Sequence, residues 1–98
     1  MSKRRVVVTG MGIISPVGND IATAWRNVVE GVSGIGPITD FDVTDFSTRF
    51  GGCIRDFNAE DHIPAKEARK MDPFIHFGIV AAQQAVADAG LADAGHAP

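Results

Sequence analysis

"DPFIHFGIVAAQQAVADAG", residues 72–90, is the stretch that decides the fold of this chain. Asp72 suits the N-cap of a helix, Pro73 suits the first helical position, and Gly90 suits the end, so we expect a helix over 73–89. Large apolar side chains are spread around the whole circumference of this helix, which is typical of a buried helix. They are Phe74, Ile75, Phe77, Ile79, Val80 and Val86.

The same helix carries a face of small residues, spaced i, i+3, i+4 and i+7, that would let another backbone approach closely. They are Gly78, Ala81, Ala82 and Ala85. The rest of the chain offers one other long helix and about two strands, which is too little to cover a helix that is apolar all round. The sequence therefore predicts a piece of a larger core.

The N-terminal stretch "RRVVVTGMGIISPVGND", residues 4–20, predicts a strand followed by a loop and a second helix. Three consecutive valines indicate a strand over 4–9 that is buried on both faces, as in the central sheet of an α/β layer fold. Asn19 or Asp20 is expected to cap a helix running to about Glu30, with Gly31 as its stop signal. The apolar stripe of that helix is Ile21, Trp25, Val28 and Val29.

The glycines of this stretch resemble a dinucleotide-binding loop only in part. Such a loop needs G-x-G-x-x-G between strand and helix, whereas the third glycine position here is Ser15 and Pro16 follows it. The helix also begins about five residues late, and the loop lacks the lysine of a P-loop. We therefore expect a tight turn with glycines where the backbone needs room, and no bound nucleotide.

The middle of the chain has weaker signals. Residues 32–48 are rich in turn-forming residues, and a short strand is expected over 49–55, although two glycines lie inside it. "IPAKEARKMD", residues 63–72, predicts a short helix with Pro64 in its first turn. The tail, residues 92–98, is expected to be a loop.

Composition excludes several classes of protein. The 98 residues suffice for one small domain, with 45% hydrophobic and 21% charged residues as in ordinary globular proteins. A net charge of -3 argues against nucleic-acid binding by the chain as a whole, and no run approaches the roughly 20 apolar residues of a membrane span. The single cysteine and the lack of a signal peptide favour a cytoplasmic location.

The residues offer no catalytic or metal-binding constellation. Cys53 lies in "FGGCIRD" without a helix N-terminus or a nearby histidine that would favour the thiolate, so we interpret it as a small, semi-buried hydrophobe. His76 is expected to make a hydrogen bond at the helix N-terminus, near Asp72. The spacing of His62 and His96 predicts neither a metal site nor a cofactor site.

Four stretches together resemble one family. "RRVVVTGMGIISPVGND", "GVSGIGPITDFD", "DFNAEDHI" and "KEARKMDPFIHFGIVAAQQAVADAGL" follow one another over residues 3–91 as in the N-terminal part of β-ketoacyl-acyl carrier protein synthases, above all the type II enzyme of bacterial fatty-acid synthesis. The resemblance implies an α/β fold of the thiolase-like kind, in which two duplicated halves form alternating helix and sheet layers, usually as a homodimer. Residues 1–98 would be about the first quarter of one ketosynthase domain, without an internal boundary.

The resemblance also implies a reaction. These enzymes condense an acyl thioester with malonyl-acyl carrier protein, by decarboxylative Claisen condensation, to give 3-oxoacyl-acyl carrier protein, using a cysteine nucleophile and two histidines and no cofactor. The family's Thr-Ala-Cys, His-Gly-Thr and Gly-His motifs are not found here, so we expect the catalytic residues to lie outside these 98 residues and the residues alone to be inactive. A polyketide ketosynthase segment, or a truncated and non-catalytic carrier-protein binding module, remains an alternative.

Lys66, Arg69 and Lys70 form the one candidate site. Their i, i+3, i+4 spacing places three cations on one face of the short helix, which by itself is more typical of a solvated face with Glu67 as a partial partner. In the family that these residues resemble, a basic patch on this helix docks the acidic acyl carrier protein. The resemblance therefore implies carrier-protein docking for Lys66, Arg69 and Lys70.

Overall fold

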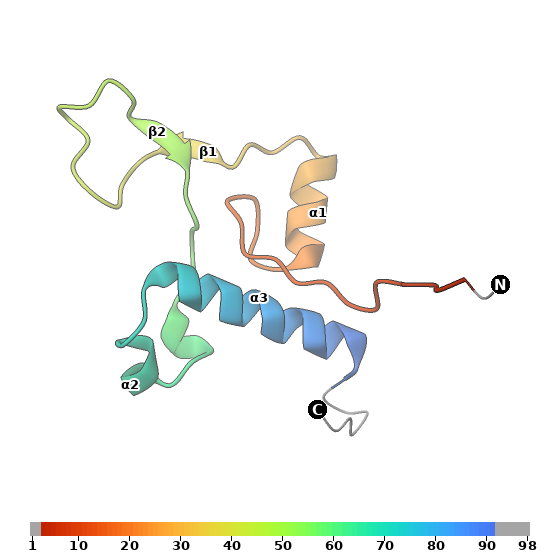
Figure 1. The fold of residues 1–98 in the computed structure, drawn as a ribbon. Coiled ribbons are helices and arrows are strands. Elements are labelled where there is room, and N and C mark those ends of the chain that lie inside the picture. The colour runs from red at the N-terminus through yellow and green to blue at the C-terminus, as the bar shows by residue number, and fades with distance from the viewer. Residues whose placement is uncertain (1–2, 92–98) are drawn as a thin grey trace.

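The long helix α3 organises the residues that the computed structural model describes, residues 3–91 (Figure 1). The N-terminal segment and α1 lie on one side of α3, and η1 and α2 lie near its N-terminal end on the other. In chain order the elements are α1 (Ile21–Val29), β1 (Ile35–Pro37), β2 (Phe50–Gly52), η1 (Ala59–Asp61), α2 (Ala65–Ala68) and α3 (Pro73–Ala89). None of the helices within the described range is long and apolar enough to cross a membrane.

Both ends of α3 are where the sequence predicts them. Asp72 occupies the N-cap position with extended backbone, although its side chain makes no capping hydrogen bond, and Pro73 is the first helical residue. Gly90 ends the helix in the left-handed conformation, at φ 72°, which a glycine adopts without steric cost. Burial around the axis is uneven: Val80 is 2% exposed, whereas Phe74 is 70% exposed. Residues 3–91 thus cover one flank of a helix that is apolar all round.

Two glycines of the N-terminal segment press against the small-residue face of α3, at a place that we call the glycine crossing. A methyl group on Gly10 would overlap the carbonyl oxygen of Ala85, and one on Gly12 would overlap the carbonyl oxygen of Ala81. Backbone therefore touches backbone here, and a side chain at either glycine position would force the helix and the segment apart. The predicted close approach is confirmed at Ala81 and Ala85.

Side chains of α3 fix the segment at the glycine crossing. The amide of Met11 donates to Asp88 Oδ2 and the amide of Ile13 donates to Gln84 Oε1, each at 3.0 Å. Gln84 also donates from Nε2 to the carbonyl of Asn19, at 2.6 Å. Asp88 and Gln84 lie one helical turn apart, so they meet alternate amides of an extended chain. The helix thereby supplies acceptors that a neighbouring strand supplies in a sheet.

The predicted strand over residues 4–9 is not found. Val6 is 91% exposed, Val7 64% and Val8 78%, and this part of the chain is assigned no strand. A strand forms by pairing with another strand, and residues 3–91 place none beside this segment. The prediction of a buried central strand is therefore wrong for the structure as described, although the valine run has the composition of one.

A two-stranded antiparallel sheet forms instead in the middle of the chain. β1 pairs with β2 in the register Ile35 with Gly52 and Pro37 with Phe50, so the strand expected over 49–55 is confirmed but shorter. β1 falls in a region that the sequence predicts as turns only, and that prediction needs correction. A three-residue strand that contains a glycine and ends in a proline has no alternation from which it could be recognised.

The helix α1 begins and ends as predicted but presents its apolar stripe outward. The carboxylate of Asp20 accepts the amide of Thr23 at 2.7 Å and caps the helix, and Gly31 follows its end at φ 72°. Ala24 is the buried side chain of α1, and Gly18 packs against its backbone. Trp25 and Val28 are exposed, so the predicted stripe meets no partner among residues 3–91.

The buried core of the described residues joins α2 to α3. Ile63, Ala68 and Val80 form one buried cluster. Partly buried hydrophobic residues pack around it: Ile14, Phe57, Ala59, Met71 and Ile79. The four-residue helix α2 is thus attached to the 17-residue helix α3.

Candidate functional site

The three predicted docking residues lie on and just after α2, and all three are exposed. Arg69 has helical backbone angles, φ -67° and ψ -16°, and the amide of Lys70 bonds to the carbonyl of Glu67 at 3.0 Å. The turn therefore continues past Ala68, and the i, i+3, i+4 spacing places the three cations on one face of it, as the sequence predicts. We call the surface formed by Lys66, Arg69 and Lys70 the α2 cationic face.

The opposite side of α2 is anchored. Ala68 is 6% exposed and packs into the cluster with Ile63 and Val80. His76, on the first part of α3, places its Nε2 2.8 Å from the carbonyl oxygen of Ala68. A carbonyl oxygen only accepts, so the imidazole donates from Nε2. The α2 cationic face is therefore presented by a single turn whose back is fixed to α3.

This contact corrects the prediction for His76. The sequence places His76 one turn after Asp72 and predicts a hydrogen bond at the N-terminus of the same helix. In the structure its imidazole reaches across to α2 instead. The bond joins residues eight positions apart on two helices, so it depends on how α2 packs, which no pattern within 73–89 reveals.

A small cavity opens beside His76. Its volume is about 240 Å³, and its lining is mostly apolar: Ile54, Phe57, Ala59, Pro73, His76 and Phe77. Phe57 meets Phe77 edge-to-face, with ring centroids 5.2 Å apart, and stacks on His62 at 5.8 Å. His62 therefore stacks on one ring of the cavity that His76 lines, whereas the carbonyl of Ala68 is bonded by His76.

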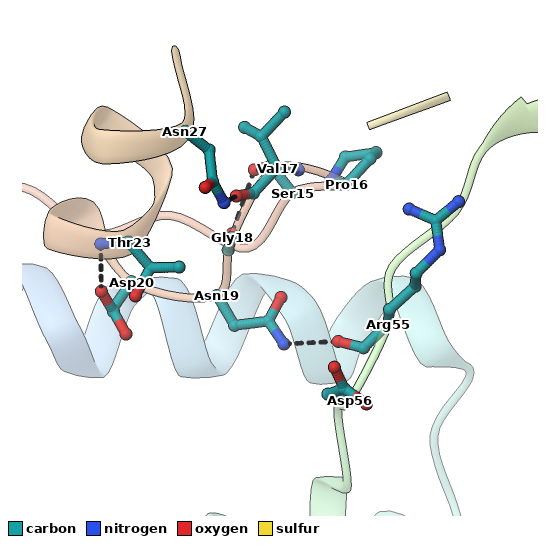
Figure 2. Close-up of a pocket in the computed structure, with 10 residues that line it drawn as sticks. All are labelled: Ser15, Pro16, Val17, Gly18, Asn19, Asp20, Thr23, Asn27, Arg55 and Asp56. Atoms are coloured by element: carbon teal, nitrogen blue, oxygen red, sulfur yellow. Dashed lines mark hydrogen bonds between the residues drawn. The ribbon is translucent and has the colours of Figure 1, made fainter. Parts of the chain in front are cut away.

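The glycine loop forms a second pocket, of about 310 Å³ (Figure 2). Ser15 and Gly18 exchange backbone hydrogen bonds of 3.0 and 3.2 Å around Pro16 and Val17, so the loop is the tight turn that the sequence predicts. Ser15 Oγ donates to the carbonyl of Gly18, so the proton of this hydroxyl is used inside the turn. The pocket lining is completed by Asn19, Asp20, Thr23, Asn27, Arg55 and Asp56.

Hydrogen bonds already occupy several of the amides that a phosphate would need. The amides of Ser15 and Gly18 bond within the turn, and those of Met11 and Ile13 bond to α3. At the N-terminus of α1, the Thr23 amide that donates to Asp20 lowers the pKa of that carboxyl, which keeps an anion where a phosphate would bind. The geometry of this loop opposes nucleotide binding.

Amide side chains hold this pocket together. Asn19 Nδ2 donates to the carbonyl of Arg55 at 2.7 Å, and Asn27 Nδ2 donates to the carbonyl of Val17 at 2.6 Å, as Figure 2 shows. The Arg55 guanidinium in turn donates to the carbonyl of Gly34 at 3.0 Å. These contacts tie the turn to α1 and to the chain after β2, so we assign the pocket a structural role.

Cys53 and the histidines form no reactive group in the described range. Cys53 is a free, partly buried thiol directly after β2. His62 ends η1 and is exposed. Residues 3–91 group no three histidine, cysteine, aspartate or glutamate side chains that could hold a metal ion. His96 lies outside the described residues.

Comparison with known proteins assigns the chain to a family. The family model described as "Beta-ketoacyl synthase, N-terminal domain" matches residues 3–97. A 3-oxoacyl-[acyl-carrier-protein] synthase 2 from Vibrio harveyi is 56% identical over 91 residues, which are 93% of this chain and 22% of that relative. The synthases 2 of Synechocystis sp. and Staphylococcus aureus are 50% and 52% identical over 93% and 90% of this chain.

A solved structure agrees with the sequence comparison. A ketosynthase/chain length factor, described as that of ishigamide, superposes with a TM-score of 0.79 at 34% identity, over 91% of this chain and 22% of that chain. The chain thus spans about a fifth of the length of the relatives that it matches, and residues 3–91 have the arrangement of the corresponding part of a ketosynthase. The chain belongs to the β-ketoacyl synthase family, and it matches that family's N-terminal domain.

Proposed function

We propose that this chain serves as the part of a 3-oxoacyl-acyl carrier protein synthase that supplies scaffold and a docking surface for the acyl carrier protein. Identities of 50–56% to several synthases 2 support the fatty-acid reaction. The observation that carries the docking role is the α2 cationic face: three exposed cations on one turn whose back is packed into a buried cluster.

Charge chemistry connects this face to its partner. An acyl carrier protein of this kind is acidic, so three clustered cations would steer its approach and fix its orientation. A single exposed ion pair contributes only about 0.2–1 kcal/mol, so appreciable binding energy requires all three cations together. The acyl and malonyl forms share the carrier, and the same face serves both.

The proposed reaction needs a nucleophile that these residues do not offer. A cysteine takes the acyl group from the acyl carrier protein as a new thioester, and the carrier's thiol leaves as its own thioester bond breaks. Malonyl-carrier then loses carbon dioxide to give a carbanion. That carbanion attacks the acyl carbonyl, so a carbon–carbon bond forms, the carbon–sulfur bond breaks and the thiol is released.

We assign the nucleophile and the assisting histidines to residues other than Cys53 and His76, and we propose that residues 1–98 are about the first quarter of one ketosynthase domain. Homodimeric assembly and a cytoplasmic location are part of the same proposal.

The polyketide alternative has one observation in its favour, the likeness to a ketosynthase/chain length factor. That likeness is 34% in sequence, against 50–56% for the synthases 2, so the fatty-acid assignment is preferred. A carrier-protein binding module without activity would show carrier binding but no condensation when joined to the rest of a synthase.

Carrier binding tests the docking proposal directly. The assays use a full-length synthase that carries residues 3–91 in place of the matching segment of the Vibrio harveyi relative. Reversing Lys66, Arg69 and Lys70 together to Glu is expected to raise the Kd for acyl carrier protein at least tenfold in calorimetry at low salt, because attraction becomes repulsion. The loss should shrink as salt is added.

A matched control separates a docking face from net charge. Reversal of Lys3, Arg4 and Arg5, which are also exposed and adjacent in sequence, changes the net charge by the same amount. We expect it to change the Kd less than threefold. Equal weakening by the two triple variants would show that the partner senses only overall charge, and the docking proposal would be wrong.

A further inference from the structure

We propose that His76 is a positioning residue for the α2 cationic face, acting through its hydrogen bond to the carbonyl of Ala68. The inference rests on the proposed docking function and adds to it the residue that sets the geometry of the docking surface. His76 itself lies on α3, so it would touch the face only through the backbone of α2.

A helix as short as α2 cannot fix its own orientation. It comprises four residues, Ala65–Ala68, and the Pro64 side chain at its N-cap position makes no capping hydrogen bond. Nucleating one turn costs more than its few hydrogen bonds return, so an isolated turn of this length is unstable in water. Contacts with its neighbours, η1 before it and α3 behind it, must therefore determine where the three cations stand.

The apolar contacts alone hold α2 against α3 but do not fix its orientation. Ala68 and Ile63 pack against Val80, and such contacts are not directional. The bond from His76 Nε2 to Ala68 O, at 2.8 Å, is directional and lies in a partly buried setting. Ala68 O also accepts the amide of Met71 at 3.2 Å, so both acceptor positions of this carbonyl are used.

The bonded carbonyl is covalently next to the docking residues. The carbonyl of Ala68 belongs to the peptide unit that joins Ala68 to Arg69, and that unit is planar. Holding its oxygen therefore fixes the plane from which Arg69 projects, and Lys70 follows directly. Lys66 lies on the same turn and moves with it. Loss of the bond should lower the fraction of molecules with all three cations in docking geometry, and apparent affinity falls by that fraction.

The test uses four variants of the full-length synthase with acyl carrier protein as substrate. His76→Phe keeps an aromatic ring in the cluster and removes the donor, and we expect KM for the carrier-bound substrate to rise about 2- to 10-fold, the range of one lost hydrogen bond, with kcat changed less than twofold. His76→Gln places an amide donor near the Nε2 position and should restore most of the loss. His76→Asn, whose donor is one bond shorter, should not. His62→Phe removes the neighbouring imidazole, which does not contact Ala68, and should leave KM unchanged.

Amide hydrogen exchange of the same variants keeps this inference separate from the docking proposal. His76→Phe should speed exchange at Arg69 and Lys70, and His76→Gln should restore the slower exchange, whether or not the face docks a carrier protein.

A normal exchange pattern and a normal KM in His76→Phe would overturn the positioning role while leaving the effect of the triple reversal, and so the docking proposal, intact. Faster exchange without any effect of the triple reversal on carrier binding would overturn the docking role and, with it, the positioning of a docking face. Loss of kcat in His76→Phe that Gln does not rescue would show a merely structural role and would also overturn the inference.

Discussion

The glycine crossing and the α2 cationic face both rest on α3, but α3 holds them in different ways. At the crossing, backbone lies directly on backbone, and two side chains of α3 bind alternate amides of the segment. At the face, one turn is attached by Ala68 and by one imidazole, and the groups that matter point into solvent. An added side-chain atom at Gly10 or Gly12 would force the segment and α3 apart. The exposed side chains of the α2 cationic face, in contrast, can change in size without a clash, and the change that matters there is one of charge.

This difference predicts how substitutions divide between stability and function. At the glycine crossing, changes should be measured as free energy of unfolding, with function lost only because the fold is lost. At the α2 cationic face, changes should leave unfolding almost unaltered and appear in carrier binding. The predictions that follow run from the largest expected effect to the smallest. The first two probe the crossing, the third probes the cap of α1, and the last measurement returns to the face.

Gly12→Val should have the largest effect. Its side chain would overlap the carbonyl of Ala81, so the segment and α3 must separate, and we expect a loss of about 3 kcal/mol or more in urea unfolding of the full-length synthase. Gly78→Ala is the matched control, because a methyl group there meets no atom of residues 3–91 and alanine favours a helix by up to about 1 kcal/mol. Equal destabilisation by both variants would contradict the special status of the crossing.

Gln84→Leu should have an intermediate effect. It removes the acceptor of the Ile13 amide and the donor to the Asn19 carbonyl, and an unsatisfied, partly buried polar group costs about 1–3 kcal/mol. Gln83→Leu changes an exposed neighbour on the same helix and should alter stability by less than about 0.5 kcal/mol. If the two variants unfold at the same urea concentration, side chains of α3 do not hold the segment.

Asp20→Ala should have the smallest effect, about 1 kcal/mol, because it removes the cap of α1. The Thr23 amide lowers the pKa of Asp20 in the folded state, so its contribution is present above the unfolded pKa of about 4 and is lost as pH falls through the folded pKa. Asp20→Asn keeps a cap, so it should retain most of the stability at pH 7 but lose this acid dependence. Identical unfolding of wild type and Asp20→Asn from pH 7 to pH 2 would show that the carboxylate charge has no part in the cap.

The sequence predicts the parts of this fold that depend on local chemistry. The ends of α1 and α3 follow from Asp20, Pro73 and Gly90, whose preferences act within one turn. The close contact at the glycine crossing follows from small residues on one face of α3, although the sequence does not say which segment makes it. The common face of Lys66, Arg69 and Lys70 can likewise be predicted, because it depends only on the geometry of one helical turn.

The remaining features depend on partners that are distant in sequence. The valine run at 6–8 has the composition of a buried strand, but a strand exists only where another strand pairs with it. β1 is too short to show a period, and its pairing with β2 spans a long loop. The bond from His76 to Ala68 requires that α2 fold back on α3, which is a tertiary property. The missed features are contacts between distant parts of the chain, whereas most of the predicted features are local preferences.

The kinetic comparison of a carrier-bound and a carrier-free substrate tests the docking role of the α2 cationic face most directly. In the full-length synthase with Lys66, Arg69 and Lys70 reversed to Glu, KM for acyl-acyl carrier protein should rise at least about tenfold, and the rise should shrink with added salt. Acylation by a small thioester without a carrier should change less than twofold, because the nucleophile and its surroundings are untouched. Equal loss with both substrates would show that these residues hold the fold, and no loss with either would show a solvated helix face; both results would contradict a docking surface.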